Sequence, residues 1–290
     1  NLLQQQQLTA ADIRAVGFHG QTVRHMPSGD VAFTLQLGDG AALAVLSGID
    51  VVTDFRSADI ALGGEGAPLA PAFHEFAFSG TEPRAIVNIG GIANITLLAP
   101  GAATRGFDTG PGNTLLDDWC REHTGKDFDD GGAWAARGEV DADLLGALRS
   151  DAYFAAAWPK STGREHFNRA WLQRHLDGAD TVPSAVDVQA TLIELTASTI
   201  VDAICASAPG ADLYVCGGGA RNDFLMQRLA ALHEGGNTMT TTALGIQPEW
   251  VEAAAFAWLA RARLLSEPGN LPPDTGASRP ASLGGLYPKL

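Results

Sequence analysis

Three short segments of the chain combine glycines with polar side chains directly after apolar runs: Asn88–Gly91, Asp108–Asn113 and Cys216–Asn222. Glycine lets the backbone come close to a phosphate group, and amides at a turn between strand and helix donate to its oxygens. One such segment is often only a tight turn, whereas three of them favour a phosphate site. None has the Gly-x-x-x-x-Gly-Lys-Ser/Thr pattern of a P-loop, and none fits the Gly-x-Gly-x-x-Gly pattern of a Rossmann fold.

The apolar runs beside these segments predict the strands that hold them. Arg84–Ile89 and Ile92–Leu98 form a hairpin with two glycines at its tip, a strand near Thr104–Phe107 leads to the second segment, and Leu213–Cys216 leads to the third. Apolar residues at helical spacing predict helices over Thr114–Glu122, from Ser184 to about Ala208, and over Asp223–His233 with Asn222 as its cap.

A second group of elements lies toward the two ends of the chain. We expect strands at Ile13–Phe18, Val31–Leu37 and Ile49–Phe55, helices at Ala41–Ser47 and Leu69–Phe78, and a last long helix from Pro248 to Leu265. The tail Pro268–Leu290 is rich in Pro and Gly and is expected to pack as extended chain. A hairpin followed by helix-linked strands indicates an α/β protein with a mixed sheet.

The composition restricts the class of protein. Hydrophobic residues make up 46% of the 290 residues and charged residues 18%, which excludes a disordered chain. Nineteen Lys and Arg against 33 Asp and Glu give a net charge of −14, which disfavours binding to nucleic acid. No run approaches 18 uninterrupted apolar residues, so no membrane partner is expected. Three scattered cysteines fit the reducing cytoplasm.

The three segments also resemble a known family. Val87–Asn94, Gly106–Asn113 and Val215–Ala220 are similar to motifs of the 1,6-anhydro-N-acetylmuramic acid kinases, which belong to the actin-like/hexokinase ATPase superfamily. The resemblance extends in chain order over nearly the whole sequence, through Gly20–Thr22, Ile49–Arg56, Gly64–Phe73, Pro159–Asn168 and Trp250–Trp258.

The resemblance implies a fold of two α/β domains with mixed sheets on either side of a central cleft that holds ATP and a sugar. We expect residues 1–80 to belong to the first domain, residues 81–265 to form the nucleotide-binding domain, and residues 266–290 to return toward the first domain. The implied reaction uses ATP, Mg²⁺ and water: the 1,6-anhydro ring is hydrolysed and O6 is phosphorylated. The product is N-acetylmuramic acid 6-phosphate, formed in peptidoglycan recycling in the cytoplasm.

Two carboxylates are candidates for the sugar chemistry. Water that attacks the anomeric carbon must lose a proton to a base, and Asp108 matches the family's catalytic Asp; the alternative for Asp108 is a turn or capping residue. Glu252 matches a family acid near the sugar, and its alternative is a favourable charge at a helix N-terminus.

Other residues are candidates for substrate binding. Gln21 and Thr22 resemble a substrate-side polar loop, and Arg56 resembles a basic residue suited to the lactyl carboxylate of the sugar, with a surface ion pair as its alternative. A polar cluster of Lys160, Ser161, Thr162 and Arg164 faces the cleft or is merely structural. The residues that the resemblance assigns to ATP are Asn88, Gly90, Gly91, Gly110, Gly217, Gly218, Gly219 and Asn222. His19 and His25 lack a third ligand at metal spacing, and the Mg²⁺ ligands stay unknown.

The sequence departs from the family pattern in two places. The first phosphate loop of the family, a Ser/Gly/Thr-rich hairpin, has no counterpart after Asn1, so we expect the first domain to be incomplete. Glu65 replaces a Gln that is usual in the family, and its charge would lie close to the carboxylate of the substrate. These departures leave the activity of the 290 residues open and give three alternatives: a different kinase of the superfamily, a noncatalytic nucleotide or muropeptide binder, or an inactive fragment. A homodimer is also left open.

Overall fold

The structure is a computed structural model that describes residues 2–158, 160–179 and 181–290. Asn1, where the chain starts, and Pro159, where the matched stretch Pro159–Asn168 starts, lie outside the described residues. The chain divides into two compact units, unit 1 with residues 1–77 and 252–290, and unit 2 with residues 78–251.

The boundary expected at residue 265 is therefore corrected to lie between Val251 and Glu252. The last long helix, α11 (Val251–Leu265), continues in sequence from unit 2. Its residues Leu259 and Ala260 nevertheless pack into one buried cluster with Val52, Phe55, Leu69 and Leu283 of unit 1. Helix α11 therefore belongs to unit 1 because of its packing, although it directly follows unit 2 in the sequence.

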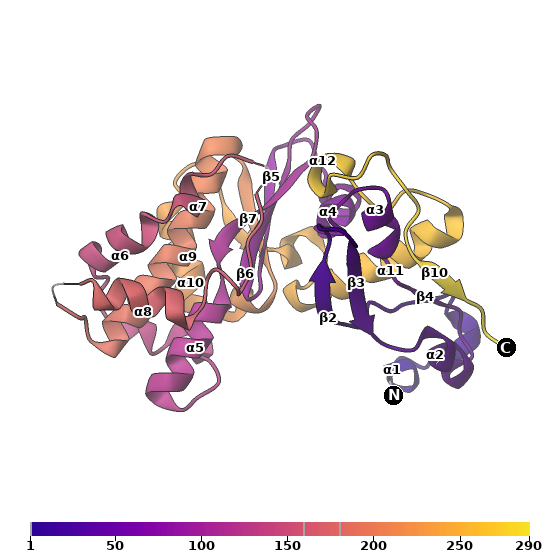
Figure 1. The fold of residues 1–290 in the computed structure, drawn as a ribbon, viewed down its shortest axis with the longest axis horizontal. Helices are drawn as coiled ribbons and strands as arrows, with labels where there is room; N and C mark the ends of the chain where they lie inside the picture. The colour runs from indigo at the N-terminus through magenta and orange to yellow at the C-terminus, as the bar shows by residue number, and fades with distance from the viewer. Residues whose placement is uncertain (1, 159, 180) are drawn as a thin grey trace. The chain divides into compact units, whose positions relative to one another are not determined.

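Unit 2 is built on a five-stranded mixed sheet with the order β7-β6-β5-β8-β9 (Figure 1). Its strands are β5 (Arg84–Ile89), β6 (Ile92–Leu98), β7 (Arg105–Pro111), β8 (Asp212–Cys216) and β9 (Thr238–Thr240). β6 pairs antiparallel with both β5 and β7, whereas β8 pairs parallel with both β5 and β9. The mixed sheet predicted from the hairpin is thus confirmed.

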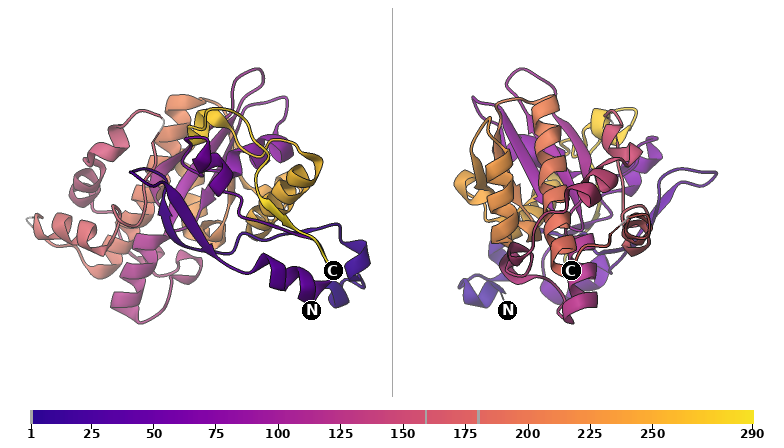
Figure 2. Two further views of the ribbon diagram at one scale, coloured as in Figure 1. Left: turned by 45° about the vertical axis from the view of Figure 1, so that its right-hand side comes forward. Right: turned by 90° about the vertical axis from the view of Figure 1, so that its left-hand side faces the viewer.

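The core of unit 2 lies between this sheet and its helices. These are α5 (Asn113–Thr124), α6 (Ala142–Arg149), α7 (Ala152–Ala155), α8 (Arg169–Asp177), α9 (Ala185–Ser207) and α10 (Asp223–Leu232), with short 3-10 helices η2 (Asp130–Gly132), η3 (Ala135–Arg137), η4 (Gly218–Arg221), η5 (Thr241–Leu244) and η6 (Pro248–Trp250). α9 packs on β6 and β7, and α5, α6 and α10 pack around α9 (Figures 1 and 2).

Helix α9 forms the centre of that core. Ser184 caps it by accepting from the Asp187 N–H, as its sequence predicts. The helix is long and apolar enough to cross a membrane by length and composition, but 72% of its apolar window is buried inside unit 2. Its apolar length is therefore explained by its place between the sheet and the surrounding helices.

Unit 1 contains two small sheets. β1 (Val16–Gly17) pairs parallel with β4 (Val51–Thr53), and β10 (Gly285–Tyr287) adds antiparallel to β4. β2 (Gln21–Met26) and β3 (Phe33–Leu37) form an antiparallel hairpin. The helices are α1 (Leu2–Gln5), η1 (Ala10–Asp12), α2 (Gly40–Ser47), α3 (Ser57–Ala61), α4 (Ala70–Phe78), α11 and α12 (Pro272–Thr275).

Two expectations for unit 1 are corrected. Gln21 and Thr22, interpreted as part of a loop, begin strand β2, because the polar residues of β2 pair with β3. The tail is not wholly extended, since it contains the helical turn α12 as well as strand β10.

A buried carboxylate joins the tail to the rest of unit 1. Asp59, on α3, is fully buried and accepts three hydrogen bonds, from the Gly66 N–H (2.8 Å), Asn270 Nδ2 (2.6 Å) and Thr275 Oγ1 (2.8 Å). These donors come from the Gly63–Gly66 loop and from the C-terminal tail. Asp59 therefore fixes the conformation of two segments that are distant in the sequence.

We expect Asp59→Ala to lower the free energy of unfolding of unit 1 by about 3 kcal/mol, because it leaves three buried donors without an acceptor. The matched control is Asp39→Ala, which removes only the N-cap bond to Ala42 N at the start of α2 and should cost about 1 kcal/mol. Urea unfolding curves of both variants measure the difference. Equal losses in the two variants would contradict the role given to Asp59.

Candidate functional site

A row of polar residues crosses three adjacent strands of unit 2. Asn88 on β5 is the register partner of Asn94 on β6, and Asn94 is the partner of Asp108 on β7. On the other side, Asn88 is paired with Cys216 at the end of β8. Because side chains of paired residues lie on the same face of a sheet, the structure brings the three predicted segments together.

Asn94 is a residue of this row that the sequence analysis missed. The sequence feature that could have identified Asn94 is the symmetry of the hairpin, in which Asn88 and Asn94 are each three residues from Gly91. Residues at equal distance from the tip of a hairpin face one another, so the partner of Asn88 can be found by counting.

The tip of the hairpin caps helix α5 with its carbonyl groups. The Gly90 oxygen accepts from Asn113 N (2.8 Å), and the Gly91 oxygen accepts from Gly112 N (3.0 Å) and Thr114 N (3.1 Å). The first amides of α5 are thus already used. Within the described residues, neither the Gly90 N–H nor the Gly91 N–H donates to a protein acceptor.

The glycines after β8 have different surroundings. Gly217 has φ of +78°, and a Cβ there would lie 2.4 Å from Asn88 Oδ1, so only glycine lets this turn come so close to Asn88. Gly218 is exposed, and its nearest neighbour is Asn113 Nδ2, 3.4 Å from a Cβ position. Gly219 is buried against the Ile89 side chain. Gly217 and Gly218 are therefore the accessible part of this turn.

Two residues that are predicted to bind ATP also have structural partners. Gly110 is buried in β7, where a Cβ would meet the ring of Phe154 at 2.7 Å. The side chain of Asn222 accepts from Leu225 N (2.9 Å) and caps α10, as predicted for its capping role. Packing and capping account for these two residues.

Asp108 is held by the segment that follows α7. Its Oδ2 accepts from Thr162 N (3.0 Å), and its backbone oxygen accepts from Tyr153 Oη (2.7 Å). Burial raises the pKa of Asp108 to about 6; the Thr162 N–H opposes this shift and the negative charge of Glu165 adds to it. A carboxylate with a pKa near 6 is ionised at neutral pH and is a stronger base than an exposed one.

Arg56 is the centre of a second cluster, in unit 1. Its Nε donates to His19 Nε2 (3.0 Å) and its Nη1 donates to the Gly66 oxygen (2.7 Å). Burial lowers the pKa of Arg56, and the negative charge of Glu252 opposes that shift. Nη2 donates to none of the described residues and is free for an anion. The structure thus brings two of the predicted substrate residues, Arg56 and Glu252, into one electrostatic environment.

His19 and His25 lie beside Arg56, a role that their sequence spacing did not indicate. Burial lowers the pKa of both imidazoles, and the positive charge of Arg56 lowers it further. His19 Nδ1 lies 2.9 Å from the Gly20 oxygen, so a neutral ring with its proton on Nδ1 presents a lone pair to Arg56.

The other predicted substrate residues, Gln21 and Thr22, are engaged within their own hairpin. Thr22 Oγ1 accepts from Gln36 Nε2 (3.2 Å), and Gln21 Nε2 donates to the Thr22 oxygen (3.3 Å). Lys160 of the polar cluster donates from Nζ to the Tyr153 and Phe154 oxygens (3.2 and 3.3 Å). Lys160 therefore connects its own segment to the backbone of α7.

The comparisons with known proteins agree with these observations. The family model described as anhydro-N-acetylmuramic acid kinase matches residues 1–289. The chain belongs to this family. It is 53% identical to the anhydro-N-acetylmuramic acid kinases of Shewanella sp. (strain MR-7) and Pseudomonas paraeruginosa, over 99% of this chain and 78% of each relative. It is 52% identical to the kinase of that name from Coxiella burnetii, over 99% of this chain and 77% of the relative.

Among solved structures, the chain is similar to the Clostridium difficile activator of 2-hydroxyisocaproyl-CoA dehydratase with bound ADPNP. The TM-score is 0.42 at 13% identity, over 70% of this chain and 69% of that one. A second similar structure is component A of (R)-2-hydroxyglutaryl-CoA dehydratase from Acidaminococcus fermentans. Its TM-score is 0.38 at 14% identity, over 64% of this chain and 68% of that one.

Metal binding by side chains alone is not indicated for this member of the anhydro-N-acetylmuramic acid kinase family. Across residues 2–158, 160–179 and 181–290, no three His, Cys, Asp or Glu side chains are grouped so that they could hold a metal ion. Mg²⁺ commonly keeps several waters and binds through nucleotide phosphates with one or two carboxylates.

The pKa of Asp108 predicts the pH dependence of turnover. Because burial raises it to about 6, kcat should fall about tenfold per pH unit below pH 6 and level off above it. Glu165→Gln removes a negative charge that helps to raise the pKa of Asp108, so the midpoint of the acidic fall in kcat should move to lower pH. Steady-state rates from pH 4.5 to 8 measure both curves. A midpoint that moves to higher pH in the variant would contradict the assignment of this fall in kcat to Asp108.

Proposed function

We infer that the protein is an ATP-dependent kinase of 1,6-anhydro-N-acetylmuramic acid. It hydrolyses the 1,6-anhydro ring and phosphorylates O6, which yields N-acetylmuramic acid 6-phosphate for peptidoglycan recycling. Membership of the anhydro-N-acetylmuramic acid kinase family supports this function. The single structural observation that carries the mechanism is the place of Asp108 on β7, where its Oδ2 accepts from Thr162 N and its register partner Asn94 pairs with Asn88.

Asp108 is proposed as the base for ring opening. It takes a proton from water as the water oxygen forms a bond to the anomeric carbon, and the bond from that carbon to O6 breaks. The Thr162 N–H donates to Oδ2, so it holds the carboxylate in one orientation and stabilises its charged form.

Phosphoryl transfer follows at the freed oxygen. O6 forms a bond to the γ-phosphorus of MgATP, and the bond from this phosphorus to the β–γ bridging oxygen breaks to leave MgADP. The unpaired N–H groups of Gly90 and Gly91 are suited to the phosphate oxygens, and the exposed Gly218 is the accessible residue of the turn after β8. Mg²⁺ bound with the nucleotide would neutralise part of the charge of the phosphates.

Arg56 is proposed to bind the lactyl carboxylate of the sugar. Its guanidinium is held by two uncharged acceptors, His19 Nε2 and the Gly66 oxygen, so its charge is available to an anion. Glu252 lies within electrostatic reach of the same group and is suited to the sugar hydroxyls. We place this reaction, which uses ATP, Mg²⁺, the sugar and water, in the cytoplasm.

Asp108→Asn tests the base. The variant keeps the shape of the side chain but cannot take a proton, so kcat should fall by about 10²- to 10⁴-fold relative to the unchanged chain. Calorimetric affinities for ATP and for the anhydrosugar should stay within about threefold. Product is measured by mass spectrometry as the 6-phosphate, with ATP, Mg²⁺ and the anhydrosugar present. Turnover near that of the unchanged chain would remove Asp108 from this role.

Arg56→Ala tests the carboxylate site. The KM for the anhydrosugar should rise about tenfold or more, because a charge-assisted hydrogen bond is lost, while the KM for ATP should change little. Arg14→Ala is the matched control, since Arg14 is an exposed arginine of the same unit whose partner is Asp50. A rise in the KM for ATP without one for the sugar would be evidence against the proposal.

A further inference from the structure

The guanidinium of Arg164 lies directly against the glycine hairpin of unit 2. A Cβ at Gly91 would be 2.9 Å from Arg164 Nη2, 3.1 Å from Nε and 2.6 Å from Thr114 Oγ1. The absence of a side chain at Gly91 therefore creates the space in which an arginine and a hydroxyl meet the hairpin tip.

The groups that meet there lack acceptors. Thr114 is 8% exposed, and its buried Oγ1 has no hydrogen-bond partner within the described part of the chain. In the same described residues, the Arg164 guanidinium makes no hydrogen bond or ion pair, and the N–H groups of Gly90 and Gly91 are unpaired. Thr114 Oγ1 is the buried group of this set, and buried polar groups are rarely left without a partner. The half-buried amides of Gly90 and Gly91 and the exposed guanidinium of Arg164 lie around it, so together these donors are suited to an anion.

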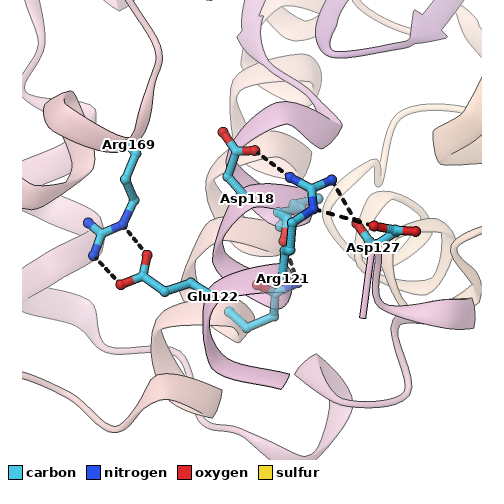
Figure 3. A network of polar contacts seen from close by, with 7 residues as sticks. Asp118, Arg121, Glu122, Asp127 and Arg169 are labelled. Atoms are coloured by element: carbon cyan, nitrogen blue, oxygen red, sulfur yellow. Dashed lines mark hydrogen bonds and ion pairs between the residues drawn. The ribbon is translucent and has the colours of Figure 1, made fainter. Parts of the chain in front are cut away.

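One carboxylate near this site has to be considered. Asp117 follows Thr114 by one helical turn on α5; burial raises its pKa to about 6, and the positive charges of Arg121 and Arg164 oppose that shift. Asp117 nevertheless makes no ion pair with Arg164, whereas Arg121 pairs with Asp118 and Asp127 (Figure 3). The Arg164 guanidinium is therefore within electrostatic reach of Asp117 but is not paired with it.

The segment that carries Arg164 is tied at both ends. Thr162, two residues before Arg164, donates from its backbone N–H to Asp108 Oδ2. Five residues after Arg164, Arg169 at the start of α8 forms a two-point ion pair with Glu122 of α5 (2.5 and 3.0 Å; Figure 3) and lies over the Trp119 ring. Thr114 is on the same helix α5. These contacts hold the segment that carries Arg164 to Asp108 at one end and to helix α5 at the other.

We propose that Arg164 binds the γ-phosphoryl group of ATP at the Gly90–Gly91 tip, with Thr114 Oγ1 as a second donor. The proposal rests on the kinase function proposed above. A phosphoryl group has three terminal oxygens, and here a hydroxyl and a planar guanidinium lie at the hairpin tip beside two unpaired amides. The segment of residues 160–165 would thus couple the base to the transferred group, while Arg56 binds the carboxylate of the sugar.

The experiment compares Arg164→Ala and Arg164→Lys with Arg174→Ala. Arg174 is an exposed arginine in the last turn of α8 that makes none of the contacts described here, so it controls for loss of positive charge. Calorimetry measures the affinity of each variant for ADP and for the nonhydrolysable analogue AMP-PNP. Steady-state rates give kcat and the two KM values.

In Arg164→Ala, affinity for AMP-PNP should fall about tenfold or more, while affinity for ADP stays within about twofold. Its kcat should fall about 10²- to 10³-fold, as for the loss of one donor to a transition state. Lysine should restore part of both losses, since it keeps the charge but not the planar fork. The Arg174 control should match the unchanged chain in every value.

Three results would overturn the proposal: equal losses of affinity for ADP and AMP-PNP, unchanged AMP-PNP affinity, or an increase confined to the KM for the sugar. The binding measurements need no sugar. If the unchanged chain does not act on the anhydrosugar, the proposed function fails, yet the difference between ADP and AMP-PNP still decides the place of Arg164.

Discussion

The carbonyl groups of Gly90 and Gly91 determine the geometry of unit 2. They accept the first amides of α5, which would otherwise lack partners, and so fix the hairpin tip to the end of β7. Since the two carbonyl groups point to α5, the two N–H groups are left for another acceptor. A helix N-terminus is a common anion site, but here the hairpin takes that role and α5 supplies a hydroxyl from Thr114.

Unit 1 has a corresponding constraint in Asp59. It accepts the Gly66 N–H, and the Gly66 oxygen in turn accepts from Arg56. A single residue, Gly66, thus links a buried structural carboxylate to the predicted substrate residue. The same loop places Glu65, whose N–H donates to the Thr275 oxygen and whose charge acts to raise the pKa of His25. Glu65 therefore belongs to the surroundings of Arg56.

The sequence allowed the prediction of β5 and β6 over the residues now observed, because their apolar runs are long and end at glycines. Strand β2 was missed because its side chains are mostly polar and exposed, and only pairing with β3 makes it a strand. α6 and α8 were not predicted within a polar, Gly-rich region; their burial depends on Leu148 and Trp171 packing into the core, which is a tertiary effect.

For the site, residue type and position in a motif indicated Asp108, Arg56 and the glycines of the hairpin, and their roles stay predictions. The sequence could not assign His19 or Asn94, because a hydrogen bond from Arg56 and a register across two strands are properties of the fold. It also could not separate Gly110 and Asn222 from Gly218, since only packing distinguishes a buried glycine or a cap from an accessible turn.

The arginines of the chain differ in their hydrogen-bond acceptors. This difference separates arginines that join helices from an arginine that is suited to bind a substrate. Arg169 and Arg228 each form a two-point ion pair, with Glu122 and Glu194, which joins helices and balances the arginine charge with a carboxylate. Arg56 is held instead by an imidazole and a carbonyl oxygen, and the pKa of that imidazole is lowered by burial and by Arg56 itself. A protonated His19 could not accept from Arg56, so the neutral ring is what fixes the guanidinium without neutralising it. In a chain with a net charge of −14, an arginine that keeps its charge beside uncharged partners is the group best suited to an anionic substrate.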